Sequence, residues 1–274
     1  MKTKLIVSAI GIACCANAIA EMFPIVDVQY GYLIGGAENG KWIESDAAKK
    51  SVKKGAKLQV YGVTGAVGVA SVVKLDTQNE PCEDRPTVKL NPNPPSHGSG
   101  VAGKMKNGAI AFSGKNPLPR KPETVDVKDK RCVDSVREFL GERGLKDPVV
   151  QITQAVKIDI DGDGGDEVVI SATHYKNGDE IPDESAPNTY SFVMLVRFSQ
   201  GKAEKQLVDG EFYPEPKPEA APPNKFEIAA IADLNGDGKI DVVVRSRYYE
   251  GDEVSVYERT ASGFNKALSV GCGL

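Results

Sequence analysis

Short runs of apolar and β-branched residues, separated by Gly, Pro, Asn and Asp, recur along the chain of 274 residues. Such runs predict β-strands when they last about four to eight residues and are bounded by turn-forming residues. The runs lie at 26–33, 57–64, 67–75, 87–90, 109–113, 192–198, 254–258 and 267–270. Asn39-Gly40 predicts a tight hairpin after the first of them. The pattern therefore predicts a mainly β fold.

One stretch has helical periodicity instead, and it predicts one short-to-medium helix over 132–140. Four of its residues share a helix face: Cys132, Val136, Phe139 and Leu140. Gly141 and Gly144 follow as stop signals, with Pro148 beyond them. A second, shorter helix is expected over 45–52, with Ser45 as its N-cap.

Two acidic, glycine-rich segments each lie between apolar runs. They occur within QAVKIDIDGDGGDEVVISATHY at 154–175 and FEIAAIADLNGDGKIDVVVRSRYY at 226–249. We call the nine-residue segments loop 1 (159–167) and loop 2 (233–241). An offset of 74 positions places Asp159 on Asp233 and Tyr175 on Tyr249, with matching glycines and a matching strand between them. We interpret the two stretches as an internal repeat.

Oxygen-bearing residues fall at positions 1, 3, 5 and 9 of each loop, a spacing that lets a short backbone curl around one hard cation. Ca²⁺ takes about 6–8 oxygen ligands. The expected ligands are Asp159, Asp161, Asp163, the carbonyl of Gly165 and Glu167 in loop 1, and Asp233, Asn235, Asp237, the carbonyl of Lys239 and Asp241 in loop 2. Clustered carboxylates repel one another without a cation, so a metal-free Gly/Asp turn is the weaker alternative. The sequence predicts two Ca²⁺ sites, with the tighter at loop 1 because its ligands include four carboxylates against three in loop 2.

The EF-hand is the main competing interpretation of these loops. It requires a bidentate Glu at position twelve and helices on both sides. Position twelve is Ile170 after loop 1 and Val244 after loop 2, and both lie in β-branched runs that favour strands. The EF-hand is therefore rejected.

The patterns DxDGDGxxE at 159–167 and DxNGDGxxD at 233–241, each followed by a strand, resemble the calcium-binding repeat of FG-GAP and VCBS-type proteins. Glu167 stands where that repeat more often has Asp. More loosely, the chain resembles secreted bacterial VCBS-repeat proteins that end in YYEG…GCG, here 248–251 and 271–273. The resemblance implies two repeats like the blades of an integrin-type propeller, at about 149–200 and 224–272. It implies a partial or divergent β-propeller-like architecture.

The N-terminal residues 1–20 have the features of a secretory signal peptide. Lys2 and Lys4 precede an apolar run, and Ala18-Ile19-Ala20 fits the A-x-A cleavage rule. The run is shorter than the ~20 residues of a membrane span, so no transmembrane segment is expected. Lipoprotein anchoring at Cys14 or Cys15 stays open as a minor alternative. We expect export to the periplasm or the extracellular space.

After the signal peptide we expect a β-rich N-terminal region at 21–125, then the helix and both repeats at 126–274. A Pro-rich connector at 214–223 would join the repeats. Removing residues 1–20 takes away two lysines and no acid, so the net charge falls from −4 to −6. This acidic balance argues against nucleic acid and anionic membranes as partners.

Three cysteines remain after residue 20, so one of them must stay unpaired if a disulfide forms. Cys132 lies on the apolar face of the predicted helix and is expected to be a packed thiol. Cys82 and Cys272 lie among polar or glycine neighbours that give no packing reason for them. We predict a Cys82–Cys272 bridge.

No segment has the spacing of a known catalytic motif. The chain has only two histidines, His97 and His174, and no HExxH sequence. The sequence therefore predicts a non-catalytic, exported, calcium-binding protein that acts as a binding or surface-interaction module for a protein or carbohydrate ligand. The alternative is a secreted hydrolase or inhibitor whose active surface lies in the N-terminal region.

Overall fold

The computed structural model describes residues 22–78, 82, 84–92, 110–114, 117–176, 178, 180–215 and 222–273. The expected signal peptide, His97 and the middle of the Pro-rich connector lie outside these residues. The prediction of a mainly β fold is confirmed: among the described residues the chain forms three sheets, with two short α-helices and one 3-10 turn. All strand pairs within these sheets are antiparallel.

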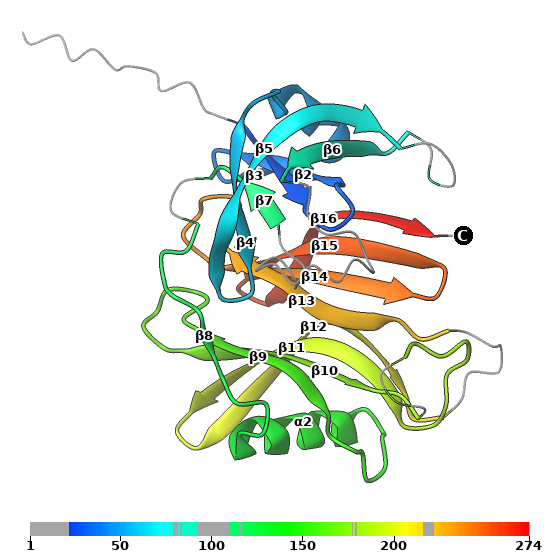
Figure 1. Ribbon diagram of the computed structural model, residues 1–274. Coiled ribbons are helices and arrows are strands. Elements are labelled where there is room, and N and C mark those ends of the chain that lie inside the picture. Colours follow the sequence, from blue (N-terminus) through cyan, green and yellow to red (C-terminus); the bar gives the residue numbers. More distant parts are fainter. Residues whose placement is uncertain are drawn as a thin grey trace, which may run out of the picture.

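The N-terminal sheet has seven strands in the order β3-β2-β1-β7-β4-β5-β6. Their bounds are β1 Phe23–Asp27, β2 Leu33–Glu38, β3 Lys41–Glu44, β4 Lys57–Gly62, β5 Gly65–Thr77, β6 Pro86–Asn91 and β7 Ile110–Phe112. The sheet curls into a half-barrel (Figure 1). Its concave side is filled by aliphatic side chains that include Val26, Leu33, Leu58, Val60 and Val72.

Of two sequence expectations for this sheet, the hairpin at 39–40 is confirmed and the single strand at 26–33 is not. The hairpin at Asn39-Gly40 is confirmed, since both residues have positive φ (52° and 73°) between β2 and β3. The single strand expected at 26–33 is wrong, because a turn divides it into β1 and β2. The N–H of Tyr30 donates to Asp27 Oδ2 at 2.7 Å, and Gly31 takes φ +77°.

The short helix after β3 is α1 Ser45–Ala48, and it is followed by the 3-10 turn Lys49–Ser51. The expected N-cap role of Ser45 is wrong. Glu44 takes the cap position without a side-chain hydrogen bond, and Ser45 Oγ instead donates to the Leu33 carbonyl at 2.6 Å. The serine therefore fastens the helix to β2.

The second sheet has five strands in the order β12-β11-β10-β9-β8. Their bounds are β8 Glu123–Thr124, β9 Ile152–Ile158, β10 Glu167–His174, β11 Thr189–Ser199 and β12 Lys202–Tyr213. The sequence did not predict β12, which lies beyond residue 200. Strands β9 to β12 follow one another as a four-stranded meander, which we call unit 1.

The third sheet is a four-stranded meander, β13-β14-β15-β16, which we call unit 2. Its strands are β13 Lys225–Ala232, β14 Asp241–Tyr248, β15 Gly251–Thr260 and β16 Gly263–Gly273. The lengths of β10 and β14 agree, and both strands begin at the last position of their acidic loop.

The sheets and the main helix stack in layers (Figure 1). Helix α2, Lys130–Glu142, covers the outer face of unit 1 and confirms the helix expected over 132–140. Unit 2 lies between unit 1 and the seven-stranded sheet. Its strand β14 points Val242 and Val244 toward unit 1 and Val243 toward the half-barrel. The run of β-branched residues is continuous because the strand is buried on both faces.

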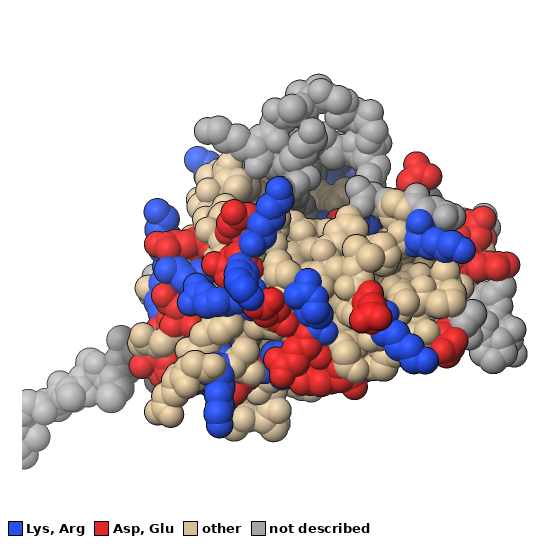
Figure 2. Space-filling model, turned by 90° about the horizontal axis from the view of Figure 1, so that it is seen from below, with Lys and Arg blue, Asp and Glu red and all other residues tan. Residues whose placement is uncertain are grey.

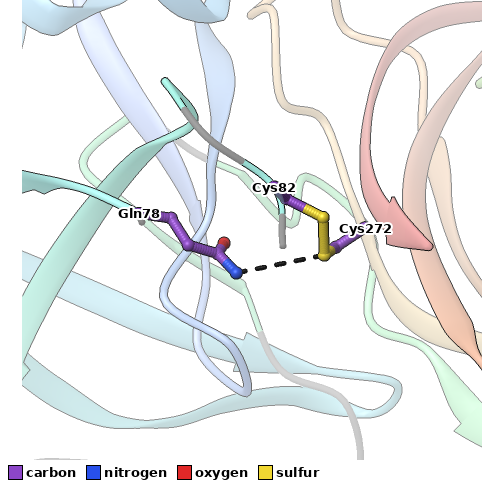
Figure 3. The surroundings of a disulfide bond; sticks show 3 residues. All are labelled: Gln78, Cys82 and Cys272. Atoms are coloured by element: carbon purple, nitrogen blue, oxygen red, sulfur yellow. Dashed lines mark hydrogen bonds between the residues drawn. A yellow bond between two sulfur atoms is a disulfide. The ribbon is translucent and has the colours of Figure 1, made fainter. Parts of the chain in front are cut away.

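A disulfide joins Cys82, near the edge of the seven-stranded sheet, to Cys272 on β16 (Figure 3). The two Cα atoms are 5.8 Å apart and the residues are separated by 190 positions. Gln78 Nε2 donates to Cys272 Sγ at 3.9 Å. The predicted Cys82–Cys272 pairing is confirmed, and Cys132 is a buried free thiol as expected.

The face seen from below Figure 1, on the side of α2, carries acidic and basic side chains interspersed (Figure 2). Lys205 on β12 bonds Glu138 and Glu142 of α2 at 2.8 Å each, so some of these charges bind the helix to unit 1. Among the residues that the structure describes, no helix has the length and apolar character needed to cross a membrane.

Candidate metal sites

Each acidic loop joins the first two strands of its unit. Asp159 directly follows β9 and Glu167 opens β10, while Asp233 directly follows β13 and Asp241 opens β14. The antiparallel registers pair Glu167 with Ile158 and Asp241 with Ala232. The hairpin therefore places the first and last predicted ligands of each loop side by side.

Four internal hydrogen bonds recur in the two loops at an offset of 74 residues. In loop 1 the bonds are Gly162 N to Asp159 Oδ1 at 2.7 Å, Gly164 N to Asp159 Oδ2 at 3.1 Å, Gly165 N to Asp163 Oδ1 at 2.8 Å and Ile160 N to Glu167 Oε2 at 2.9 Å. In loop 2 they are Gly236 N to Asp233 Oδ1 at 2.7 Å, Gly238 N to Asp233 Oδ2 at 2.9 Å, Lys239 N to Asp237 Oδ1 at 2.8 Å and Leu234 N to Asp241 Oδ2 at 2.8 Å. The two loops therefore share one backbone conformation.

Glycine at the fourth and sixth positions makes this conformation possible. Gly162 and Gly164 have φ of +79° and +89°, and Gly236 and Gly238 have +80° and +87°. A side chain is strained at such angles, whereas glycine adopts them freely.

Loop 1 brings carboxylate oxygens together as a cation site requires. One oxygen from each of Asp159, Asp161 and Glu167 lies within 4.8 Å of the others. Asp161 Oδ1 is buried and has no hydrogen-bond partner among the described residues. A buried acceptor without a donor costs about 1–3 kcal/mol. A bound cation would satisfy this oxygen, so the donor set fits calcium.

Arg197 on β11 reaches into loop 1 from the neighbouring strand, where the register pairs it with Glu167. Its Nε donates to Glu167 Oε1 at 2.6 Å, its Nη2 to Asp161 Oδ2 at 2.8 Å, and its Nη1 lies 3.0 Å from Asp163 Oδ2. The guanidinium thus contacts three of the four predicted carboxylate ligands. The spacing of residues along the chain did not indicate this contact.

The carboxyl groups of loop 1 respond to both their burial and this arginine. Burial raises the pKa of Glu167, although the Ile160 N–H and Arg197 oppose the shift. The Gly165 N–H, with Arg197, lowers the pKa of Asp163. The arginine therefore favours the charged forms of both groups.

The first two predicted ligands of loop 2 are more deeply buried than their counterparts in loop 1, and the position corresponding to Arg197 does not hold a cation. Asp233 and Asn235 are 5 % exposed, whereas their counterparts Asp159 and Asp161 are half-buried. The last ligands, Glu167 and Asp241, are both almost completely buried. The register pairs Val242 with Tyr257, so Glu258 lies beside Asp241, where unit 1 has Arg197. Burial raises the pKa of Asp241 well above its usual value, and nearby carboxylates, Glu258 among them, raise it further. Burial also raises the pKa of Asp233.

Arg120, which precedes β8, connects the two loops. Its Nε donates to the Asp159 carbonyl, and its Nη2 donates to the Gly238 carbonyl at 2.9 Å. The N–H of Ile240 also donates directly to the Ile160 carbonyl at 2.8 Å. The predicted sites are therefore adjacent, which spacing along the chain did not reveal.

Away from both loops, a pocket of about 430 Å³ opens between the two units. It is lined by Asp209, Asn224, Phe226, Ser246, Tyr248, Asp252, Glu253, Lys266, Gly271, Cys272 and Gly273. Two of its acidic groups have partners: Glu253 bonds Lys266 at 2.8 Å, and Asp209 accepts from the Tyr257 hydroxyl. The third, Asp252, has one buried oxygen, Oδ1, without a hydrogen-bond partner among the described residues. His174, on β10, is not among these lining residues.

In comparisons with known proteins, no family model, curated protein or solved structure matches the chain.

Proposed function

We propose that the chain is an exported calcium-binding protein, in which one Ca²⁺ at each acidic loop holds the first two strands of a unit together. The observation that supports this most is the recurrence of one loop conformation at two places, with oxygen donors at the same positions and the same glycine geometry. In this proposal the Gly165 and Lys239 carbonyls supply the remaining protein ligands. The Cys82–Cys272 disulfide supports the export, because disulfides persist in oxidising compartments.

We further propose that units 1 and 2 are blades of the FG-GAP or VCBS type, set against the half-barrel instead of closing into a ring. Each is a four-stranded antiparallel meander whose acidic loop joins its first two strands, and propeller blades have four such strands. The protein then acts as a non-catalytic binding or surface-interaction module, and its calcium ions have a structural role.

Thermal unfolding of residues 21–274 in calcium and in EGTA tests the calcium proposal. A ligand that binds only the native state stabilises it by ~2.7 kcal/mol per site at a hundredfold excess over its Kd. We expect the melting temperature to rise with calcium and not with magnesium at equal ionic strength. The variant D159N/D233N should lose the response. An identical melting temperature in both buffers, together with no heat in a calorimetric calcium titration, would refute the proposal.

A further inference from the structure

The two loops have the same backbone but different electrostatic neighbours. In unit 1 the residue paired with the last loop carboxylate is Arg197, and in unit 2 the corresponding position holds Glu258. One unit thus places a cation against its predicted metal ligands where the other places an additional carboxylate.

The contacts of Arg197 are directed at metal-ligand oxygens. Its three nitrogens contact Asp161 Oδ2, Asp163 Oδ2 and Glu167 Oε1, so one oxygen of each of these carboxylates is already engaged. Its side chain is 31 % exposed and projects from a strand, which leaves it room to move away. A guanidinium carries a permanent positive charge that repels an approaching cation.

Glu258 has the opposite effect in unit 2. Trp42 Nε1 donates to its Oε2 at 2.6 Å and Asn265 Nδ2 donates to its Oε1 at 3.1 Å. These neutral donors hold the carboxylate in place without cancelling its charge. It therefore adds to the negative potential around Asp241, which is almost completely buried.

The charged groups that face the predicted ligands differ between the loops. Arg197 contacts the ligand carboxylates of loop 1, whereas Glu258 lies beside those of loop 2. Outside the ligand set, Asp166 of loop 1 pairs with Lys157 at 3.4 Å, and Lys239 of loop 2 is exposed. The number of ligand carboxylates, four against three, favours loop 1, but the direct contacts of Arg197 favour loop 2.

We propose that Arg197 is an internal counter-ion that lowers the calcium affinity of loop 1, so that loop 2 is the tighter site and fills first. This inference depends on the proposed function, because it ranks two sites for the ion that the function requires. Calcium at loop 1 must displace the guanidinium or share the carboxylates with it, and both cost affinity.

Calcium titration of chelator-treated protein, followed by calorimetry, tests the order. D161A removes a ligand from loop 1 and D237A removes one from loop 2, so each variant isolates the other site. Trp42 is the only tryptophan in the chain and contacts Glu258, so its fluorescence is a second reporter weighted toward loop 2. We expect D161A to keep the tighter binding step and D237A to keep the weaker one.

R197M tests whether the charge of Arg197 causes the lower calcium affinity of loop 1, because it removes that charge but keeps an unbranched side chain. In the D237A background it should tighten calcium binding at loop 1 by at least ~tenfold, the effect of one nearby charge. R197K is the matched control and should change the affinity less, because it keeps the positive charge. If R197M folds only with calcium, its affinity can be measured from the bound state by competition with a chromophoric chelator.

E258Q gives an independent test, because it removes the extra charge at the corresponding position in unit 2. In the D161A background it should weaken binding at loop 2 by a few-fold to ~tenfold. Calcium bound first at loop 1, or unchanged loop 1 affinity in R197M, overturns this inference and leaves the proposed function standing. Absence of binding at both loops in the unmodified chain overturns both.

Discussion

Loops 1 and 2 share their backbone and differ in their surroundings. Both have left-handed glycines at the fourth and sixth positions, and both use the first aspartate to accept N–H groups from these glycines. Loop 1 has the more exposed first ligands and Arg197 as a cationic neighbour, whereas loop 2 has buried first ligands and lies beside Glu258. The comparison shows that the spacing of residues within a loop determines its backbone conformation. Residues on the adjacent strands determine which charges lie beside its carboxylates.

The largest expected difference between the loops concerns the first ligand. We expect Asp233→Ala to lower the free energy of unfolding by about 4 kcal/mol in calcium at a hundredfold excess over the loop 2 Kd, and Asp159→Ala to cost less. Loss of the site removes ~2.7 kcal/mol, and amides left without an acceptor add to it. Asp233 accepts from the N–H groups of Gly236, Asp237 and Gly238, whereas Asp159 accepts from two glycines.

Urea denaturation in calcium measures both losses. Asp→Asn at the same positions is the control, because it keeps an acceptor oxygen and changes only the charge. A larger loss at Asp159 than at Asp233 would reverse the ranking of the loops.

An intermediate effect is expected when the connection between the loops is removed. Arg120→Met deletes the donors to the Asp159 and Gly238 carbonyls and should cost about 2–3 kcal/mol. The exposed neighbour Lys121 offers the matched control, since Lys121→Met should leave stability nearly unchanged. Hydrogen exchange at the Ile240 amide, which bonds the Ile160 carbonyl, should become faster only in the Arg120 variant. Equal exchange rates in the two variants would show that the loops are held together without Arg120.

The smallest expected effect on stability comes from Asp252, which lies outside both loops. It must be measured before any pH dependence of stability is assigned to the loops. Burial, together with the nearby Asp27 carboxylate, raises the pKa of Asp252 to about 6. The folded state therefore holds this proton more tightly than the unfolded chain, whose Asp pKa is about 3.9. Stability should fall as pH rises from about 4 to about 6 and then level off.

Asp252→Asn should remove this decrease and make the protein about 1–2 kcal/mol more stable than the unmodified chain above pH 6. Below pH 4 the two should be equally stable. The measurement is a series of urea denaturation curves across this range in EGTA. A variant that is less stable than the unmodified chain at pH 7 would contradict the assignment.

Much of the fold could be predicted because its strands are runs of β-branched residues buried on one or both faces. The exception of β12 has a physical cause: its sequence KAEKQLVDGEFY is largely polar, and the strand lies at a sheet edge where most of its side chains are only half buried. The turn within 26–33 was missed because Val28 and Tyr32 are buried core residues even though the chain reverses between them.

The predicted ligand positions came from short-range spacing, which is why each loop could be recognised from nine residues. Arg197 and Arg120 could not be found in this way. Arg197 is 30 positions from Glu167, and its contact depends on the β10–β11 register. Arg120 is 39 positions from Asp159, and its contact depends on how the chain crosses from one sheet to another. Such contacts are properties of the folded arrangement.

The middle layer of the stack comes after both outer layers in the sequence. Unit 2, residues 225–273, covers the apolar faces of both the half-barrel and unit 1, so neither outer sheet can complete its burial until these residues are available. During synthesis from the N-terminus, the apolar faces of the half-barrel and of unit 1 therefore stay exposed until unit 2 has been made. A chain truncated before residue 225 would expose both at once and would be expected to aggregate instead of persisting as a smaller domain.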